Sequence, residues 1–467
     1  MTTSTTMTGT IDVAGILERQ KLSRFLIGLV TISWIITFFD GFDANVIGYA
    51  APYLSNEFHL SRVMMGNLFS IGLFGTLVGG FLFGYIGDRI GRRPSIIVAT
   101  AAFGVLTLVF SLCTNYGALM TVRFIDGIAL GGMLPLAWAL NVEYAPKHYR
   151  STIVTVIMIG YSVGTAVGGP IALWLIPSFG WQSVFVFGGA LSLLAAGVLF
   201  AMLPESVRFL TSKGGSPEVI ARLLHRVTGE AVSPDARFVI PDEEGFAKDF
   251  KPALLFRGWL RWITPLYWIG YIFSSMTAFF LATWTPLVFE ALKFSRPEAA
   301  AAGSISAVAG AIGGLLLMRF TDRRGPIAIA VMPLVAIPLL LIAAFVNVGH
   351  AAFMALFGLI AMFLIGGHFG NHSIAGIFYP SAYRGNGAGW ATSVAKIGSI
   401  AGPFLAGVIL STNLPTRNIF AVLAICPAVF VICIFVVGRI YNAMQHEDER
   451  GTSAATAAFP APAGNAP

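Results

Sequence analysis

The sequence predicts an all-α membrane protein whose chain crosses the bilayer many times. Of its 467 residues, 56% are hydrophobic and only 11% are charged, whereas soluble proteins carry about 25% charged residues. Mostly apolar stretches of helical length recur from near residue 24 to near residue 442. Each can cross a hydrocarbon layer of about 30 Å as a helix. The three cysteines lie inside these stretches without metal-ligand spacing, so we expect neither a disulfide framework nor a metal site.

Twelve transmembrane helices follow from the polar, Gly and Pro positions that interrupt the apolar stretches. In chain order they are expected near 24–54, 62–87, 95–114, 117–145, 152–177, 181–203, 260–290, 297–318, 327–348, 351–380, 387–411 and 415–442. The longest polar interruption carries acidic and basic side chains in similar numbers, which indicates a solvated loop. The chain therefore divides into a lead-in with a six-helix bundle, a central loop, a second six-helix bundle and a disordered tail, at 1–203, 204–259, 260–442 and 443–467.

The lead-in segment 11–25 has apolar residues at helical spacing between charged ones. This pattern fits a helix lying along the inner membrane surface, and it equally fits a short solvated segment. The sequence leaves both open.

Lysine and arginine are distributed unevenly between the two sides of the predicted membrane. Of the 29 basic residues, the loops of one side hold only Arg62, Lys293, Arg296 and Arg417. Because basic loops stay in the cytosol, we expect both termini on the cytosolic side of a cell inner membrane. The same bias accounts for the net charge of +7 and the pI near 9.4, so no nucleic-acid partner is expected.

The two halves of the chain carry matching short motifs. "GYIGDRIGRRP" (84–94) matches "MRFTDRRGP" (318–326), and "APKHYR" (145–150) matches "YPSAYR" (379–384). The matched pairs, all 234 positions apart, are Asp88/Asp322, Arg89/Arg323 and Arg150/Arg384. Several matches at one offset indicate a duplication. Because each half has an even number of spans, both have the same orientation, and such parallel repeats place a binding site between them near the middle of the membrane.

Asp40 and Asp43 place two carboxylates inside the first apolar stretch, in "TFFDGFDANV". Three positions apart, they project from about the same helix face. Two nearby carboxylates in a low dielectric resist joint ionisation, so one of them can carry a proton near neutral pH. The alternative is a structural pair that neutralises charges on another helix. Charged residues inside a bilayer are functional by default, which favours proton coupling.

Three more charges in the N-terminal half are candidates for coupling. Arg123 is the expected positive partner, because arginine stays protonated and binds carboxylates with two hydrogen bonds. Asp126 either takes part in coupling or simply neutralises Arg123. Glu143, near the cytosolic end of its helix, acts in proton transfer or in a gate.

The C-terminal half supplies candidate ligands for a substrate anion. Lys396 lies ten residues into its predicted helix and either binds a carboxylate or pairs with an aspartate near the middle of the membrane. His368 and His372 share one helix face and can donate to a carboxylate or phenolic oxygen. No third residue completes a metal site.

Aromatic residues are frequent around these positions. Aromatic side chains suit an aromatic ligand through offset and edge contacts, although most of them individually fit an interfacial belt. Tyr271, Trp284 and Trp390 are the candidate substrate contacts, because they share helices with polar or helix-breaking residues.

The loop after the second helix combines charge with glycine and is a candidate gate. Asp88 can cap a neighbouring helix N-terminus and pair with an arginine across the cytosolic face, which would hold one conformation and release it in another. The arginines alternatively serve only to orient the chain. The gating set is Gly84, Asp88, Arg89, Gly91, Arg92 and Arg93, with Asp322 and Arg323 as its second copy and Arg384 from the other repeated motif.

Several of these motifs resemble known families. "GYIGDRIGRRP" resembles the signature loop of the major facilitator superfamily, and "RFIDG" (123–127) resembles its fourth-helix motif, with Asp126 where the family often has Gln. "DGFD" (40–43) is similar to the Asp-Gly-x-Asp signature of the aromatic acid:proton symporters. "YRGNGAGWATSVAKIGSIAGP" (383–403) is similar to the eleventh-helix region of that family, with Lys396 where Arg is common. The resemblance covers roughly residues 24–442 and implies the major facilitator fold.

These observations predict a secondary active transporter that imports a small aromatic carboxylate, such as a hydroxybenzoate, by proton symport through alternating access. The alternatives are an efflux antiporter of the same fold, an importer of a non-aromatic organic acid, and a membrane sensor that binds the acid without carrying it. The sequence shows no hydrolytic or redox motif and no phosphate-binding loop, so neither enzyme activity nor a cofactor is expected. The expected partners are the substrate anion, protons and the lipid bilayer, with the protein acting as a monomer.

Overall fold

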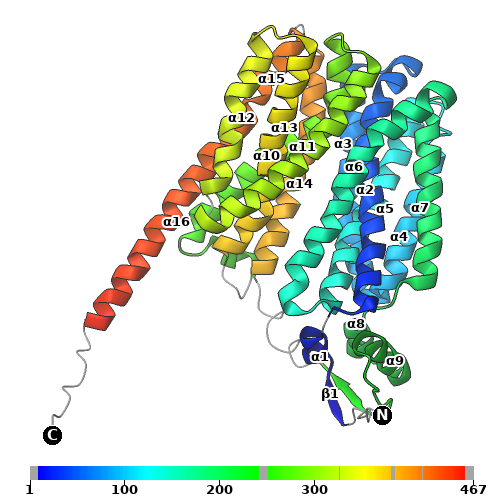
Figure 1. Cartoon of the computed structure of the whole chain (residues 1–467), viewed down its shortest axis with the longest axis vertical. Helices are drawn as coiled ribbons and strands as arrows, with labels where there is room; N and C mark the ends of the chain where they lie inside the picture. The colour runs from blue at the N-terminus through cyan, green and yellow to red at the C-terminus, as the bar shows by residue number, and fades with distance from the viewer. Residues whose placement is uncertain are drawn as a thin grey trace.

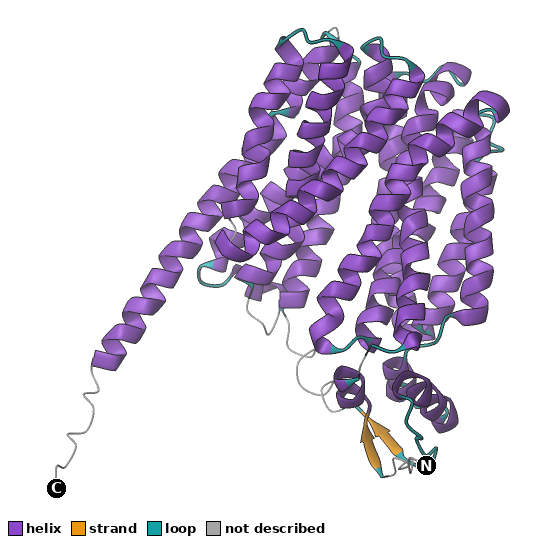
Figure 2. Cartoon of the chain, in the orientation of Figure 1, coloured by secondary structure: helices purple, strands orange, loops and turns teal. Residues whose placement is uncertain are grey.

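The computed structural model describes residues 9–20, 22–240, 251–324, 327–379, 384–412 and 414–457. Long helices standing side by side make up almost all of it (Figure 1; Figure 2). Eleven helices of the described chain are long and apolar enough to cross a membrane, and α12 adds a shorter apolar helix with two internal prolines. The predicted all-α, multi-pass architecture is confirmed.

The membrane helices follow the predicted order and, with one exception, end within a few residues of the expected positions. The N-terminal half contains α2 (Arg24–Glu57), α3 (Arg62–Ile90), α4 (Arg92–Phe110), α5 (Tyr116–Tyr144), α6 (Arg150–Phe179) and α7 (Gln182–Met202), with a 3₁₀ turn (Lys147–Tyr149) before α6. The C-terminal half contains α10 (Leu260–Ala291), α11 (Arg296–Arg324), α12 (Ile327–Phe345), α13 (His350–Phe378), α14 (Arg384–Leu410), α15 (Ile419–Leu423) and α16 (Ile425–Ala457), with 3₁₀ turns at Pro252–Phe256 and Thr416–Asn418.

Polar side chains decide where several N-terminal helices begin. Ser23, Ser61 and Asn115 each accept a hydrogen bond from a backbone N–H three residues further on, at 3.3, 3.2 and 2.9 Å. Such N-caps satisfy donors that the first helical turn leaves unpaired. The polar residues that interrupt the apolar stretches therefore also start the next helix.

The last helix differs from the prediction at both ends. Residues 416–423 form a 3₁₀ turn and α15, and α16 begins only at Ile425. Pro427 explains this break, because it lacks the N–H that would bond the carbonyl of Leu423. At the other end α16 continues to Ala457, so the prediction of a disordered tail from 443 was wrong for 443–457. That segment is rich in good helix formers such as Ala, Glu, Gln and Arg, and 458–467 lies outside the described residues.

The two halves repeat one packing scheme. In the N-terminal half, α2 packs on α6, α3 on α5 and α4 on α7; in the C-terminal half, α10 packs on α14, α11 on α13 and α12 on α16. Between the halves, α3 packs on α14, and α11 packs on α6. These two contacts are equivalent, because α3 and α11 are the second membrane helices of their halves and α6 and α14 are the fifth. Helices α2 and α10 meet each other. This pattern confirms two parallel repeats related by a pseudo-twofold axis.

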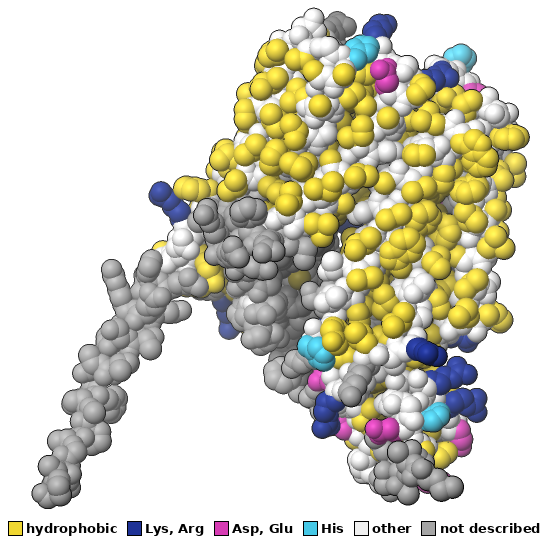
Figure 3. Space-filling view, viewed as in Figure 1, with side chains coloured by type: hydrophobic (Ala, Val, Ile, Leu, Met, Phe, Trp, Pro, Cys, Tyr) yellow, Lys and Arg dark blue, Asp and Glu magenta, His cyan; other side chains and the backbone are white. Residues whose placement is uncertain are grey.

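Both chain termini lie at one end of the bundle (Figure 1), which we call the terminal face. The opposite face carries the loops that precede α3, α5, α11 and α13. Hydrophobic side chains cover the visible side of the bundle, whereas charged side chains gather mainly near its two ends (Figure 3). This distribution is the one expected when the sides of the bundle contact lipid.

The lead-in and the central loop fold together below the N-terminal half. Their elements are β1 (Thr10–Asp12), α1 (Val13–Arg19), α8 (Val207–Ser212), α9 (Pro217–Thr228) and β2 (Arg237–Val239), and the two strands pair in parallel. Leu17 of α1 and Leu224 of α9 are buried in the same apolar cluster, and Glu18 pairs with Arg150 at the start of α6 (3.0 Å). The lead-in is therefore neither a free surface helix nor a solvated segment, because the central loop covers its apolar side. The central loop itself is partly folded.

Candidate functional site

The buried charges of the N-terminal half meet at Arg123 on α5. Its Nη1 donates to Asp43 Oδ1 (3.0 Å) and to Asp126 Oδ2 (3.0 Å), and its Nη2 lies 2.9 Å from Asp43 Oδ2. Thr107 Oγ1 donates to the other Asp126 oxygen (3.3 Å). Asp43 and Asp126 are each only 1% exposed. Arg123 therefore bridges both carboxylates at once: it pairs locally with Asp126 on its own helix and also with Asp43 on α2.

Asp40 lies almost one turn before Asp43 on α2 but has a different partner. The opposite charge that acts on its carboxylate is the ammonium group of Lys396 on α14. Lys396 Nζ also donates to the carbonyl and hydroxyl oxygens of Thr76 on α3, both at 3.3 Å. Lys396 thus reaches from the C-terminal half to α3 of the N-terminal half.

The charges of this group do not balance. It contains three carboxylates, Asp40, Asp43 and Asp126, and two cations, Arg123 and Lys396, so full ionisation leaves one excess negative charge in the membrane interior. An uncompensated charge there is unfavourable, and one bound proton removes it. Asp43 and Asp126 both contact Arg123, whereas the described residues form no ion pair with Asp40. Asp40 is therefore the acid of this group that Arg123 does not hold.

Gly41, between the two aspartates, lets α2 and α6 touch. A Cβ at this position would lie 2.7 Å from the carbonyl carbon of Tyr161, and the Gly41 carbonyl accepts a hydrogen bond from Thr165 Oγ1 (3.0 Å). Small residues permit such close helix contacts in membranes. The glycine therefore determines how closely α6 holds the acid-bearing helix.

Gly41→Ala is expected to lower the thermal unfolding temperature of the purified protein, because the added methyl group pushes α2 away from α6. Overpacking of this kind costs about 1–3 kcal/mol. Gly28→Ala is the matched control, because Gly28 lies on the same helix and a Cβ there would meet nothing within 4 Å. Equal unfolding temperatures for the two variants would show that the α2–α6 contact tolerates the methyl group.

A second polar cluster lies between α10 and α13 in the C-terminal half. Ser274 Oγ lies 3.0 Å from His368 Nδ1 and accepts a 3.0 Å hydrogen bond from Asn371 Nδ2. The Tyr271 ring packs near the His368 ring, with centroids 5.7 Å apart. Ser274 and Asn371 were missed from the sequence, although Asn371 stands in the same "GGHFGNHS" motif as the histidines. His372 lies on α13, but its side chain is outside the described residues.

The three aromatic candidates lie in different places. Tyr271 adjoins His368 of α13. Trp284 is fully buried, donates from Nε1 to the Pro403 carbonyl (3.0 Å) and packs edge-on against Phe69 of the other half. Trp390 is 44% exposed near the terminal end of α14 and stacks on Trp268, with centroids 6.2 Å apart. Trp284 thus joins the halves instead of facing the polar cluster.

The predicted gating loop is organised by a residue that sequence reasoning did not select. Glu205, just after α7, accepts hydrogen bonds from the backbone N–H groups of Arg92 (2.9 Å) and Arg93 (3.2 Å) and so caps α4. Gly91 permits this approach, because it has φ +108° and a Cβ would lie 2.9 Å from the Glu205 carboxyl carbon. The prediction that Asp88 supplies the cap was wrong. Its side chain is 71% exposed and pairs with Arg92 (2.9 Å).

Arg92 connects this loop to Glu143. Arg92 Nε lies 3.2 Å from the Glu143 carboxylate, which also accepts a hydrogen bond from Ser206. Glu143 therefore belongs to the terminal-face network and not to the Arg123 cluster, a position that suits a gate. The remaining predicted gate residues make no contact with the C-terminal half in the described chain: Arg89 stacks on Tyr85, Arg93 donates to the Phe200 carbonyl, and a Cβ on Gly84 would meet nothing. The side chains of Asp322, Arg323 and Arg384 lie outside the described residues.

The contacts between the two halves cluster toward the opposite face. Ser70 donates to the Ile400 carbonyl (2.7 Å), and the contact between Lys396 and Thr76 lies nearest the middle of the membrane. Beyond Thr76, toward the terminal end of α3, the described residues make no hydrogen bond or ion pair with the C-terminal half. The halves are thus joined on the opposite side and diverge toward the terminal face (Figure 1).

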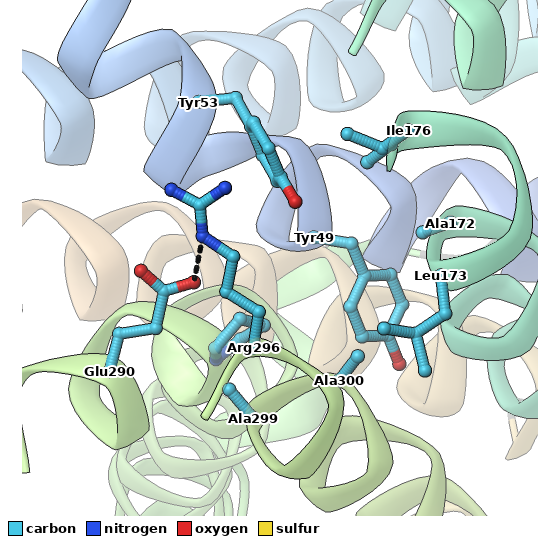
Figure 4. Close-up of a pocket in the computed structure, with 10 residues that line it drawn as sticks. Tyr49, Tyr53, Ala172, Leu173, Ile176, Glu290, Arg296, Ala299 and Ala300 are labelled. Atoms are coloured by element: carbon cyan, nitrogen blue, oxygen red, sulfur yellow. Dashed lines mark ion pairs between the residues drawn. The ribbon is translucent and has the colours of Figure 1, made fainter. Parts of the chain in front are cut away.

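A small pocket marks this closed side (Figure 4). The Arg296 guanidinium lies over the Tyr53 ring, 4.4 Å from its centroid, and Arg296 Nε pairs with Glu290 at 3.8 Å. Tyr49 lines the same pocket from α2. Because Tyr53 is ten residues beyond Asp43 on α2, about 15 Å along the helix, the pocket is separate from the buried charges and belongs to the contact between the halves.

Comparison with known proteins agrees with this architecture. The profile of the Major Facilitator Superfamily matches residues 33–375 and 268–463. The 4-hydroxybenzoate transporter PcaK of Acinetobacter baylyi is 30% identical over 434 residues, which cover 92% of this chain and 95% of that protein. The gallate transporter of Pseudomonas putida is 30% identical over 458 residues, which cover 96% and 98%.

Solved structures share the fold at low sequence identity. The xylose transporter XylE from E. coli, in its inward-open conformation, matches with a TM-score of 0.67 at 16% identity and covers 89% of this chain and 96% of that chain. A bacterial homologue of the human lysosomal transporter Spinster, in an inward-facing and occupied conformation, matches with a TM-score of 0.63 at 17% identity, covering 91% and 98%. The resemblance first seen in the signature loop is confirmed, and the chain belongs to the major facilitator superfamily as a multi-pass membrane transporter and not an enzyme.

Proposed function

We propose that this protein imports a small aromatic carboxylate, such as a hydroxybenzoate, together with protons by alternating access. The observation that carries the proposal is the charge group inside the bundle, where Lys396 of the C-terminal half contacts Thr76 and lies near Asp40 of the N-terminal half. The names of its relatives, which transport 4-hydroxybenzoate and gallate, support the class of substrate. The basic residues of the terminal face support a cytosolic location for both termini in a bacterial inner membrane.

The coupling follows from competition for Lys396. While Asp40 is ionised, it attracts the Lys396 ammonium group. A proton on Asp40 removes this attraction, so Lys396 becomes available for the carboxylate of a substrate. Proton and anion therefore promote each other's binding, and linkage makes this effect reciprocal. Co-binding of the two is the requirement for symport.

The conformation of the chain represents one end of the transport cycle. With the terminal face in the cytosol, the contacts that join the halves close the outer side, and the site is released toward the inside. Return to the outward-facing state separates Arg296 from Tyr53 and Lys396 from Thr76, and brings the terminal ends of the halves together. The Arg92, Glu143 and Glu205 network holds the terminal ends of α3, α4 and α5 as one rigid unit during this movement.

The charge arrangement also supports symport over antiport. An antiporter needs proton and substrate to compete for one site, as a cationic substrate would compete for Asp40. An anion that binds Lys396 does not compete with a proton on Asp40. For an anionic substrate, the pair therefore supports symport.

Proteoliposomes containing the purified protein test this proposal directly. We expect labelled 4-hydroxybenzoate to accumulate when the outside is acidic, and its addition without a gradient to make the outside more alkaline. Benzoate and protocatechuate test the range of aromatic substrates, and muconate is the non-aromatic control. Acidification of the outside would indicate antiport, preferred uptake of muconate would indicate a non-aromatic acid importer, and binding without flux would indicate a sensor. Each of these results would overturn the proposal.

A further inference from the structure

A groove runs between α2 and α7 in the N-terminal half, apart from the buried charges. It encloses about 200 Å³, whereas an engineered apolar cavity of about 150 Å³ already binds benzene. Every residue that lines the groove is apolar, among them Ile32, Ile36 and Phe39 of α2 and Ala195 and Leu199 of α7. Such walls offer water no hydrogen-bond partner, so the groove suits an apolar group and not solvent.

The groove opens toward lipid and not toward the path between the halves. Helix α7 packs on α2, α4 and α6, and it lies at the edge of the N-terminal half, away from the C-terminal half (Figure 1). On α7, the lining residues Leu194 and Val198 are 67% and 44% exposed, whereas Leu199 and Ile36 of α2 are buried. Exposed apolar surface of a membrane-spanning helix is surface for lipid. The apolar group available at this position is therefore an acyl chain.

The helix face that lines the groove continues to a cation at the terminal face. Arg24, Gly28, Ile32, Ile35 and Phe39 recur every three or four positions along α2, so they share one face. A Cβ on Gly28 would meet nothing within 4 Å, so no side chain closes this face between Ile32 and Arg24. Arg24 is exposed at the first residue of α2, and its side chain forms no ion pair within the described residues. The groove thus has a positive charge at its terminal end.

The dimensions match one leaflet of a bilayer. Arg24 and Phe39 are fifteen positions apart, which is about 22 Å along a helix. A bilayer is about 40–45 Å thick with its headgroups, so one leaflet is about half of that. A phospholipid whose phosphate lies at Arg24 therefore reaches Phe39 with the end of its acyl chain.

We propose that an anionic phospholipid of the leaflet on the terminal side binds here, with its headgroup at Arg24 and one acyl chain in the groove between α2 and α7. The chain gains little from the hydrophobic effect, because the surrounding lipid is equally apolar. An unfilled groove, however, loses dispersion contacts that a chain restores, and Arg24 favours a negatively charged headgroup. Phe39 directly precedes Asp40, so the bound lipid contacts the helix that carries the buried acids. This inference does not depend on which substrate is carried.

Photo-crosslinking in phosphatidylcholine proteoliposomes tests the site. The probes are phosphatidylglycerol and phosphatidylcholine, each with a diazirine on its acyl chain and each added at the same small mole fraction. We expect mass spectrometry to find the labels concentrated at 32–39 and 191–199, with phosphatidylglycerol labelling about fivefold more, the effect of one cation beside an anionic lipid. Arg24→Gln should reduce this labelling to the level of phosphatidylcholine. Arg439→Gln is the matched control, because Arg439 is also an exposed arginine of a membrane helix, α16, and it should leave the preference unchanged.

Gly28→Phe supplies a second variant, which blocks the face between Arg24 and the groove. The open space at Gly28 accepts the ring without a clash, so we expect an unchanged thermal unfolding temperature and weaker labelling of the groove by both lipids. Labels spread evenly over the lipid-facing helices of the wild type would show ordinary lipid contact and overturn the inference. Equal labelling by the two lipids, or a preference that survives Arg24→Gln, would also overturn it, because Arg24 would then serve only to orient the chain.

Discussion

The Asp40→Asn variant is expected to lose proton-driven accumulation of the aromatic acid while it still exchanges labelled for unlabelled acid across the membrane. The amide resembles the protonated acid, so Lys396 stays available for the substrate carboxylate in both conformations, but no proton travels with it. With an applied gradient of one pH unit, each coupled proton supports about tenfold accumulation, and the variant should accumulate none. Uptake and counterflow in the same proteoliposomes measure the two activities.

Asp43→Asn is the informative comparison for this experiment. Asp43 contacts Arg123 through both carboxylate oxygens, so its replacement should weaken folding as well as transport. If Asp40→Asn protein accumulates the acid with unchanged pH dependence, Asp40 is not the coupling acid. If only Asp43→Asn abolishes accumulation in well-folded protein, the proton instead binds at the Arg123 cluster.

Arg123→Leu is expected to produce the largest loss of stability in the membrane interior. The substitution leaves Asp43 and Asp126, each 1% exposed, without the cation that both contact. Removing one partner of a buried ion pair costs about 3–5 kcal/mol, and here one cation serves two carboxylates. The thermal unfolding temperature and the yield of folded protein in detergent measure the effect.

Arg123→Lys is the control that keeps the positive charge but removes the hydrogen-bonding geometry of the guanidinium group. Lysine keeps the positive charge but cannot contact Asp43 with two nitrogens of one planar group while also reaching Asp126, so we expect intermediate stability. Adding Asp43→Asn to Arg123→Leu should recover part of the loss, because one unpaired carboxylate is removed. An Arg123→Leu variant that unfolds at the wild-type temperature would mean that both acids are protonated in the folded protein.

Hydropathy and motif spacing in the sequence were by themselves sufficient to predict the architecture of this protein. The apolar stretches are long enough that only membrane-crossing helices can satisfy the hydrogen bonds of their backbone, and polar caps such as Ser61 and Asn115 separate one span from the next. The repeated motifs predicted two parallel halves, which the exchanged contacts α3 with α14 and α6 with α11 display. The acids in "DGFD" and Arg123 were predicted because charged residues are rare in such a sequence.

Only the tertiary structure decided which charges and hydrogen-bonding groups meet. Arg123 contacts Asp43 on another helix as well as Asp126 on its own. Lys396 lies near Asp40, and Glu205 instead of Asp88 caps α4. Apart from the contact between Arg123 and Asp126, each of these joins residues of different elements. Spacing along one helix predicts which side chains share a face, but partners on other helices depend on how those helices pack. Small residues such as Gly41 control that packing, because one added methyl group would push two helices apart. For this reason the contact between Asn371 and Ser274, two ordinary polar residues in the sequence, was found only when α10 and α13 were placed side by side.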